Sequence, residues 1–263
     1  MKNIMPMQPY VQMNVKDYKI RKRMELGISH YYEFALNSSM PVIDAVPDAS
    51  IDLLFNIGEN KVKTYVSGTV FKAKYWEMGE NDICFGVRFQ PGQGILPKEI
   101  SIDMLINNDL EIDGDIFGKG LTEQIALAES MDERYRLFRT AYEKLIGKEQ
   151  LSDSKKNIVE YMIQRIYETN GQIVIGELAE ETNYSSCYLR RVFREKNGIS
   201  PKQFAQYIRF QSLLEKNEKQ KLRYDELALE CGYYDEPHMM KEFKLYSGIT
   251  LEKYRELRSK TIY

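Results

Sequence analysis

The feature that most constrains this chain is a repeat in its C-terminal part. Glu177-Leu-Ala-Glu-Glu-Thr-Asn-Tyr184 recurs 49 residues later as Glu226-Leu-Ala-Leu-Glu-Cys-Gly-Tyr233. Further on, Phe193-Arg-Glu-Lys-Asn-Gly-Ile-Ser200 recurs 50 residues later as Phe243-Lys-Leu-Tyr-Ser-Gly-Ile-Thr250. Two copies are too few for a solenoid of stacked repeats, which needs about three or more. The repeat therefore predicts a duplicated module, with one residue inserted where a turn absorbs it.

The first copy has the residue types of two short helices joined by a tight turn. Ala179 is small enough for a second helix to cross closely, and Asn183 tolerates a left-handed backbone. Ser185 then offers the side-chain oxygen that caps a new helix. The second copy repeats these residue types at Ala228, Gly232 and Asp235, followed by Pro237 in the first helical turn. The repeat therefore predicts two helix-turn-helix units, at about 173–197 and 223–247.

Helical spacing assigns two faces to the second helix of each unit. Leu189 and Phe193 are four residues apart and are expected to face the core, as are Met239 and Phe243 in the second copy. The opposite face of the first helix carries three arginines, Arg190, Arg191 and Arg194. Clustered charge usually marks a solvated helix face. On the second helix of a helix-turn-helix, however, it favours contact with DNA.

A spacer helix is predicted between the copies. Ser200-Pro-Lys-Gln203 is a capping box with proline at the first helical position, and the helix is expected to run through about Leu214. From Ile175 to Arg255 the chain resembles the AraC/XylS family of transcription regulators. The resemblance is carried by Leu178-Ala, Tyr184-Ser, Tyr188-Leu-Arg-Arg-Val-Phe193, Gly-Ile-Ser-Pro201, Tyr207-Ile-Arg209, Leu227-Ala, Cys231-Gly-Tyr-Tyr-Asp235, Phe243-Lys, Ser247-Gly-Ile-Thr and Tyr254-Arg255. His238-Met-Met and Thr250-Leu251 depart from the commonest form, and the second departure is expected to loosen a helix start.

The resemblance implies which side chains reach double-stranded DNA. The expected DNA-binding residues are Ser185, Ser186, Cys187, Tyr188, Arg190, Arg191, Arg194, Glu236, His238, Met240 and Lys241. Arginine suits bidentate contact with guanine edges or with phosphate. Glu236 fits two roles equally, accepting a hydrogen bond from cytosine or favouring the helix dipole at an exposed first turn.

The N-terminal half reads as short strands separated by turns. The clearest strands are 51–57, 62–66 and 83–89, which are rich in β-branched and aromatic residues. The runs Val46-Pro-Asp-Ala-Ser-Ile-Asp-Leu-Leu-Phe55, Gly86-Val-Arg-Phe-Gln-Pro-Gly92 and His30-Tyr-Tyr-Glu-Phe34 resemble a sensor-like domain that often precedes AraC-type DNA-binding halves. This resemblance implies a β-rich, cupin-like domain that acts by binding a small-molecule effector or by dimerising.

Helical spacing replaces the strands after Leu121. It continues through Phe138 and Tyr142 to Ile146, and Met131-Asp-Glu-Arg is expected to divide it into two helices. The stripe holds more apolar residues than packing on a small sheet requires. A homodimer would bury the surplus. The alternative is that these helices pack only on their own chain.

Candidate ligand-binding residues in this half are Tyr65, Tyr75, Trp76 and Arg88, although core packing explains each of them individually. Asp48 and Asp52 are assigned to a turn and an edge strand. The chain has 2 histidines, His30 and His238, one in each half, so a histidine-based metal site is not expected and no cofactor is predicted. No nucleophile elbow, P-loop or dinucleotide fingerprint is present in the sequence, so an enzyme is not expected.

The chain is predicted to be an α+β protein of two domains, a β-rich cupin-like domain with a helical tail (1–147) and an all-α domain with two helix-turn-helix units (157–263), joined by a linker (148–156). Residues 151–263 hold 19 basic and 17 acidic residues, so their net charge is +2 while that of the whole chain is −2. An architectural protein that binds DNA without sequence preference would need a more basic domain. A small-molecule-binding or enzymatic protein with a vestigial DNA-binding tail is the other alternative, against which the arginine face argues.

The sequence also predicts the location of the protein. It contains no apolar run of the ~20 residues that a membrane span requires, and its first residues lack a secretory pattern. The cysteines Cys84, Cys187 and Cys231 are too widely separated to suggest a metal pair or a disulfide framework. A cytoplasmic, sequence-specific transcription regulator is therefore expected.

Overall fold

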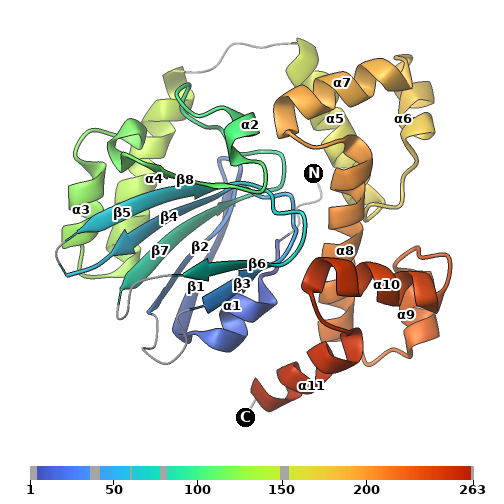
Figure 1. Cartoon of the computed structure of the whole chain (residues 1–263). Coiled ribbons are helices and arrows are strands. Elements are labelled where there is room, and N and C mark those ends of the chain that lie inside the picture. The colour runs from blue at the N-terminus through green and yellow to red at the C-terminus, as the bar shows by residue number, and fades with distance from the viewer. Residues whose placement is uncertain (1–4, 36–41, 60, 78–81, 149–153, 262–263) are drawn as a thin grey trace.

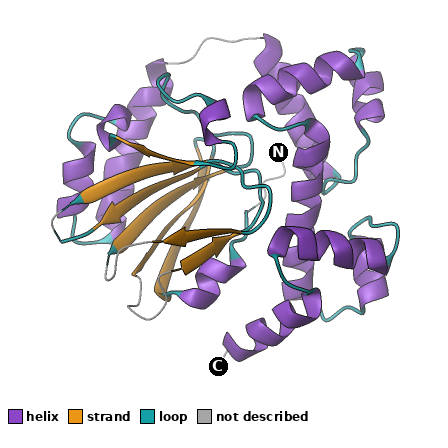
Figure 2. Cartoon of the chain, in the orientation of Figure 1, coloured by secondary structure: helices purple, strands orange, loops and turns teal. Residues whose placement is uncertain are grey.

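A computed structural model describes residues 5–35, 42–59, 61–77, 82–148 and 154–261. A β-rich N-terminal part and a helical C-terminal part lie side by side (Figures 1 and 2). This arrangement confirms the predicted α+β class. The predicted linker falls largely on 149–153, which lies outside the described residues.

The N-terminal part contains two antiparallel sheets within the described residues. The larger sheet has the strand order β1-β2-β7-β4-β5-β8, and β3 pairs with β6 in the smaller one. The strands are β1 (Lys16–Glu25), β2 (Ile28–Ala35), β3 (Val42–Ala45), β4 (Asp52–Ile57), β5 (Val62–Ser67), β6 (Lys74–Glu77), β7 (Ile83–Phe89) and β8 (Asp109–Ile112). The three strands predicted from sequence are β4, β5 and β7, and they lie next to one another in the larger sheet.

Alternation along these strands gives the larger sheet two different faces. Leu53, Phe55 and Val87 belong to an apolar core on the face covered by α3 (Leu121–Leu127) and α4 (Met131–Lys148). On the other face, Tyr32 and Leu54 belong to a smaller cluster, beside polar and charged side chains. The second face is turned toward β3 and α1 (Pro9–Asn14).

The two predicted helices after residue 121 are present, but their break falls before Met131 rather than at 131–134, because α4 already begins at Met131. Arg134 in the first turn of α4 is buried and fixes the junction. It donates to the carbonyls of Ile125 (3.1 Å) and Ala128 (2.5 Å) at the end of α3. It also donates to Glu33 on β2 (2.7 Å), so the junction is held against the sheet.

The apolar stripe of α4 is largely used within the chain. Phe138 and Tyr142 are fully buried against the sheet, where Phe138 lies 6.3 Å from Phe55 between ring centroids. Leu127 remains 74% exposed at the end of α3, while Leu137 and Leu145 are half-buried. The surplus inferred from the sequence is therefore smaller than expected.

The C-terminal part contains seven helices within the described residues, as the predicted all-α domain requires. They are α5 (Ser154–Glu168), α6 (Ile175–Thr182), α7 (Ser186–Asn197), α8 (Pro201–Lys219), α9 (Tyr224–Glu230), α10 (Glu236–Ser247) and α11 (Leu251–Thr261). The spacer helix α8 runs five residues beyond the predicted Leu214. At the start of α11 the hydroxyl of Thr250 accepts from the backbone N–H of Lys253 (3.2 Å). This helix start therefore keeps a side-chain cap, although Thr250-Leu251 departs from the commonest form.

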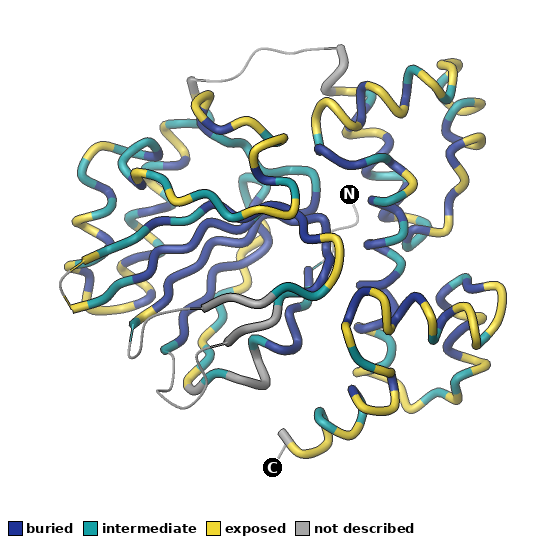
Figure 3. The backbone as a smooth tube through the Cα atoms, viewed as in Figure 1, coloured by how far each residue is buried: buried dark blue, intermediate teal, exposed yellow. Residues whose placement is uncertain are grey.

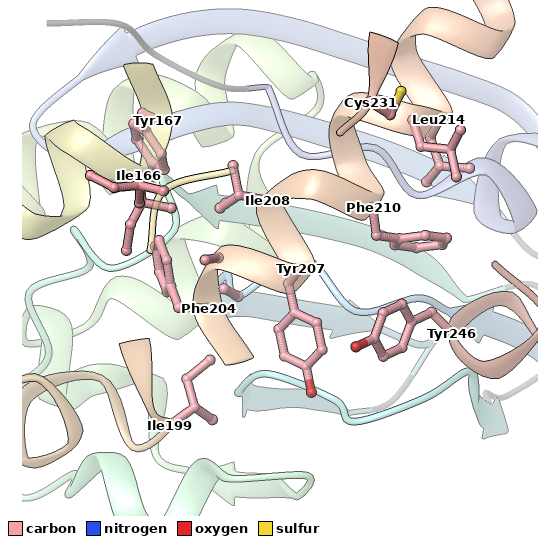
Figure 4. Close-up of a cluster of buried hydrophobic side chains, with 14 of the residues drawn as sticks. Ile166, Tyr167, Ile199, Phe204, Tyr207, Ile208, Phe210, Leu214, Cys231 and Tyr246 are labelled. Atoms are coloured by element: carbon pink, nitrogen blue, oxygen red, sulfur yellow. The ribbon is translucent and has the colours of Figure 1, made fainter. Parts of the chain in front are cut away.

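Helix α8 is the centre of this domain and is buried along much of its length (Figure 3). Tyr207 and Phe210 of α8 pack against Tyr246 of α10, each with 5.3 Å between ring centroids (Figure 4). Phe204 packs against Phe193 of α7 at 5.2 Å. The spacer helix thus carries both helix-turn-helix units on one core. None of the helices in the described ranges is long and apolar enough to cross a membrane.

Candidate nucleic-acid interface and an internal cavity

The first helix-turn-helix has the geometry expected from its sequence. Asn183 ends α6 in the left-handed conformation, with φ 56°. The hydroxyl of Ser185 then accepts from the backbone N–H of Tyr188 (3.2 Å) and caps α7. Leu189 and Phe193 are fully buried and fix the inner face of α7. The turn and the cap together set the angle at which α7 leaves the domain.

The outer face of α7 holds the predicted DNA-binding residues. Arg190, Arg191 and Arg194 are exposed, and so are Ser185 and Cys187, while Ser186 and Tyr188 are half-buried. The Arg191 guanidinium lies 5.3 Å from the ring centroid of Tyr188 and forms an exposed ion pair with Glu195 (3.1 Å). An exposed pair of this kind is weak. The arginine therefore remains available to a phosphate or a base edge.

The second unit follows the same plan. Gly232 adopts φ 71°, and Asp235 accepts from the backbone N–H of His238 (2.8 Å) to cap α10. The four predicted DNA-binding residues here divide into exposed side chains, His238 and Lys241, and half-buried ones, Glu236 and Met240. Met240 packs against the hydrophobic core of the domain. Less of the Met240 side chain is therefore available to contact DNA than the sequence predicts.

A buried ion pair ties α10 to the spacer helix. Arg209 of α8 donates to Glu242 of α10 (2.8 Å), and Tyr233 also donates to Glu242 (2.8 Å). The Arg209 guanidinium lies over the Tyr233 ring, 4.5 Å from its centroid. This cluster orients the second helix relative to α8.

Two exposed tyrosines near the turns were missed by the sequence reasoning. Tyr234 is 93% exposed and is the residue inserted between the repeat blocks of the second unit. Tyr184 is 49% exposed and stacks on Tyr188, with 4.9 Å between ring centroids. The insertion itself was the available signal for Tyr234, because an extra residue in a turn is expected to project outward.

A cavity of about 50 Å³ lies in the N-terminal part, on the face of the larger sheet that α3 and α4 do not cover. Its floor is a line of register partners on β2, β7, β4, β5 and β8, here called the polar row: His30, Arg88, Asp52, Ser67 and Asp109. Directly paired residues of an antiparallel sheet point to the same face. The cavity floor is therefore polar from one side of the sheet to the other.

The centre of the polar row is a buried charge cluster. Arg88 donates through Nε to Asp48 (2.9 Å) and through Nη1 to Asp52 (2.7 Å). Tyr32 donates to the same oxygen of Asp52 (2.6 Å). Burial raises the pKa of Asp52 to about 6, although Arg88 pulls it in the opposite direction. Burial, with Arg88 and Lys22 nearby, lowers the pKa of His30 to about 3.

The assignment of Asp48 and Asp52 to a turn and an edge strand is wrong for Asp52. Strand β4 lies between β7 and β5 in the interior of the sheet, and Asp52 is 8% exposed. Asp48 does occupy a turn, where it accepts from the backbone N–H of Ser50 (2.9 Å). Four-residue spacing in sequence did not reveal that both carboxylates meet one arginine.

The predicted ligand-binding residues do not all meet at the cavity. Arg88 lines it, whereas Tyr65 lies outside the lining, packs beside the Tyr32 cluster and donates to Glu111 (3.3 Å). Tyr75 and Trp76 belong to β6, where they pair with Asp44 and Ile43, but their side chains lie outside the described part of the chain. Sequence reasoning missed Ser67 and Asp109, whose role emerges only from strand pairing.

The cavity is connected to the helical domain by hydrogen bonds. Gln8 donates to Asp48 (2.9 Å) and exchanges two bonds with the backbone of Val46. Next to them, Gln211 of α8 donates to the carbonyl of Pro47 (3.0 Å) and accepts from the N–H of Met7 (2.7 Å). Gln211 is 2% exposed. The spacer helix therefore contacts the segments that form one wall of the cavity.

Further contacts reach the C-terminal ends of α7 and α10. Tyr10 of α1 donates to the carbonyl of Ser247 (2.8 Å), and the N–H of Ala73 donates to the carbonyl of Tyr246 (3.1 Å). A side chain placed at Gly198, just after α7, would meet Ile106 at 2.9 Å. Both second helices thus have their C-terminal ends against the N-terminal part, and their capped N-terminal ends lie away from it (Figure 1).

Comparison with known proteins agrees with this geometry. Residues 178–257 match the family described as a helix-turn-helix domain. A helix-turn-helix-type transcriptional regulator of Haemophilus influenzae is 35% identical over 85 residues, which cover 31% of this chain and 28% of that protein. The C-terminal part is an AraC-type helix-turn-helix domain.

Solved structures with some likeness were also found. The C-terminal domain of AraT, a response regulator from Geobacillus stearothermophilus, has 24% identity and a TM-score of 0.35, over 41% of this chain and 87% of that one. ToxT from Vibrio cholerae O395 has 9% identity and a TM-score of 0.45, over 88% of this chain and 98% of that one.

Proposed function

We propose that the chain is a sequence-specific transcription regulator that reads double-stranded DNA with α7 and α10. The observation that carries the proposal is the pair of capped second helices, each with buried residues on one side and exposed polar side chains on the other. Helix α8 holds both on one core, so that they can enter successive major grooves ~34 Å apart on one side of the duplex. Such a monomer reads a directional site, and it would act in the cytoplasm.

Within this proposal the exposed arginines have different tasks. Arg190 and Arg191 lie near the capped end of α7, which enters the groove first, and contact base edges. Arg194 lies a turn further along and holds phosphate. In α10, the exposed His238 and Lys241 make the main contacts with DNA. The half-buried Glu236 and Met240 contact DNA with the smaller part of their side chains that is exposed.

We infer that the N-terminal part (1–147) controls the DNA-binding domain (157–263), with a small molecule in the cavity as effector. The supporting observation is the hydrogen-bonded route from Arg88 through Asp48 and Gln8 to the segment that Gln211 of α8 holds. A ligand that moves Asp48 would alter the wall that the spacer helix contacts. Regulation by such a molecule, rather than catalysis, is the role proposed for this part.

Selection of duplexes by the full-length protein tests DNA recognition. Binding to a pool of random duplexes, followed by sequencing of the retained fraction, is expected to yield a non-palindromic site with two segments one helical turn apart. The control is the double variant Arg190→Ala/Lys241→Ala, which is expected to lose enrichment in both segments. A retained pool with no sequence preference would refute the proposal.

Homodimerisation is a second proposed property, favoured by a groove between α4 and the short helix η1 (Gly114–Phe117). Leu137, Ala141 and Leu145 line it from one face of α4 and are half-buried. A symmetric dimer would cover the same surface on both chains. Sedimentation of the full-length protein at micromolar concentration is expected to show a dimer that Leu137→Lys converts to a monomer, and a monomeric wild type would exclude it.

A further inference from the structure

The cavity floor contains buried acceptors without donors. Asp52 Oδ1, Ser67 Oγ and Asp109 Oδ1 have no hydrogen-bond partner within the described part of the chain. All three residues line the cavity, and they are consecutive in the polar row on β4, β5 and β8. Side chains paired in this way lie about 5 Å apart. A buried acceptor without a donor is unfavourable, so this part of the floor is suited to a ligand that brings donors.

The charges around the floor leave an excess of carboxylate. Asp48 and Asp52 share the single guanidinium of Arg88, and the other oxygen of Asp109 pairs with Lys74 (2.6 Å). Among the residues that line the cavity and their ion-pair partners, three carboxylates therefore face two cations. Lys22, the register partner of His30 on β1, is exposed and lies outside the cavity lining. His30 at the end of the row adds no charge near neutral pH, because burial lowers its pKa to about 3. A carboxylate buried without its own counter-ion is costly, and a cationic ligand would balance it.

One side of the cavity is apolar and aromatic. The Tyr32 ring lies over Gly86 so closely that a Cβ added there would overlap the ring. Tyr18 and Phe34 stack on Tyr32, each with 6.0 Å between ring centroids, and Leu54 completes this side. These surfaces suit a compact apolar body more than a polyhydroxylated one.

We propose that this cavity binds a small organic cation, a primary amine on a compact apolar body, with its ammonium group between Asp52, Ser67 and Asp109. An ammonium has three donors and no acceptor, which matches three acceptors that lack donors. A carboxylate ligand would meet the excess negative charge. A metal ion is not favoured, because no group of three or more histidine, cysteine or acidic side chains that could hold one is present in the described ranges. The amine would be the effector, so its regulatory role rests on the proposed function, whereas its binding does not.

Thermal unfolding of the full-length protein with matched probes tests the proposal. Isobutylamine and benzylamine are the cations, isobutanol and benzyl alcohol the neutral counterparts, and isobutyrate and benzoate the anions. At about ten times its dissociation constant, an amine is expected to raise Tm by about 3 °C. The alcohol and the carboxylate that carry the same apolar group as the amine are expected to leave Tm unchanged. No shift with either amine, or an equal shift with its alcohol or carboxylate, would overturn the proposal.

Variants locate the ammonium. Asp52→Asn is expected to reduce amine affinity at least tenfold, but it also alters the contacts of Arg88 and Tyr32. Ser67→Ala avoids this difficulty, because the Ser67 hydroxyl has no partner to lose among the described residues, and a threefold to tenfold loss is expected. Thr64→Val is the matched control. Thr64 carries a buried hydroxyl without a partner on the same strand, but it lies outside the cavity lining. Equal losses in Ser67→Ala and Thr64→Val would place the amine elsewhere.

DNA affinity is measured on the same samples. An amine that raises Tm and leaves DNA affinity unchanged would support this binding site and remove its regulatory role. Specific DNA binding by a protein whose Tm responds to neither amine would sustain the proposed function and refute the ligand class.

Discussion

Replacing His30 should change how the stability of the protein depends on pH. The His30 side chain is buried, with 3% of its surface exposed. Burial is the main reason that its pKa falls from 6.5 to about 3. Between these two values the unfolded chain binds a proton at this position and the folded chain does not. The stability that neutral His30 contributes is therefore complete above pH 6.5, and it is lost as the pH falls toward 3.

The magnitude follows from the unfolded pKa. At a pH of about 5 the linkage relation gives a loss of about 2 kcal/mol relative to a pH of about 7.5. Asp52 contributes with the opposite sign, because its raised pKa of about 6 favours the folded state as the pH falls. The pH dependence of the wild-type unfolding free energy therefore does not give the contribution of His30 by itself, and a variant is required.

Urea unfolding of wild type and His30→Asn at both pH values measures this contribution. Asparagine keeps a polar atom near Nδ1, which lies 3.0 Å from the Ser29 hydroxyl. The difference in unfolding free energy between the two proteins is expected to shift by about 2 kcal/mol in favour of the variant at the lower pH. The control is His238→Asn, since His238 is the other histidine and its side chain is 46% exposed. The same pH dependence in His30→Asn and wild type would refute the reasoning.

Three further predictions concern α7, the cavity wall and α8. Arg190→Ala and Arg191→Ala should each cost ~1–3 kcal/mol on the selected site and relax base preference there, whereas Arg194→Ala should weaken all duplexes alike; competition binding separates these outcomes. Gly86→Ala should displace the Tyr32 ring and lower the unfolding free energy by ~1–3 kcal/mol in urea titrations, and an unchanged value would contradict the close approach. Arg209→Met should leave Glu242 buried without its cation and cost about 3 kcal/mol, with Arg223→Met on the exposed pair with Asp225 as a near-neutral comparison.

The helical half could be predicted from sequence because its signals are local. Asn183, Gly232 and the capping residues Ser185 and Asp235 lie within one turn of the structure that they determine. The apolar pattern predicts an end of α8 near Leu214, but the helix continues past its buried residues to Lys219. The side chains of this last stretch give no apolar period.

The cavity could not be assembled from sequence because its residues meet only through strand pairing. The sequence indicates Arg88 as a candidate, but its partner Asp52 lies on a neighbouring strand, and no local pattern fixes the register of the two strands. Ser67 and Asp109 join the same row through two further pairings. The sequence predicts the break between α3 and α4 at 131–134, where three charged residues follow Met131, but α4 already begins at Met131. Arg134 is buried in the first turn of α4 and donates to two carbonyls at the end of α3. Its charge therefore caps α3 and does not interrupt α4.

The most direct test of the central claim is the affinity of the full-length protein for two duplexes of equal length and composition, one carrying the selected site and one scrambled. Fluorescence anisotropy over a range of salt concentrations measures both. The selected duplex is expected to bind at least a thousandfold more tightly, and both affinities are expected to fall steeply with salt, as phosphate contacts require. Equal affinities at every salt concentration would contradict sequence-specific recognition by α7 and α10.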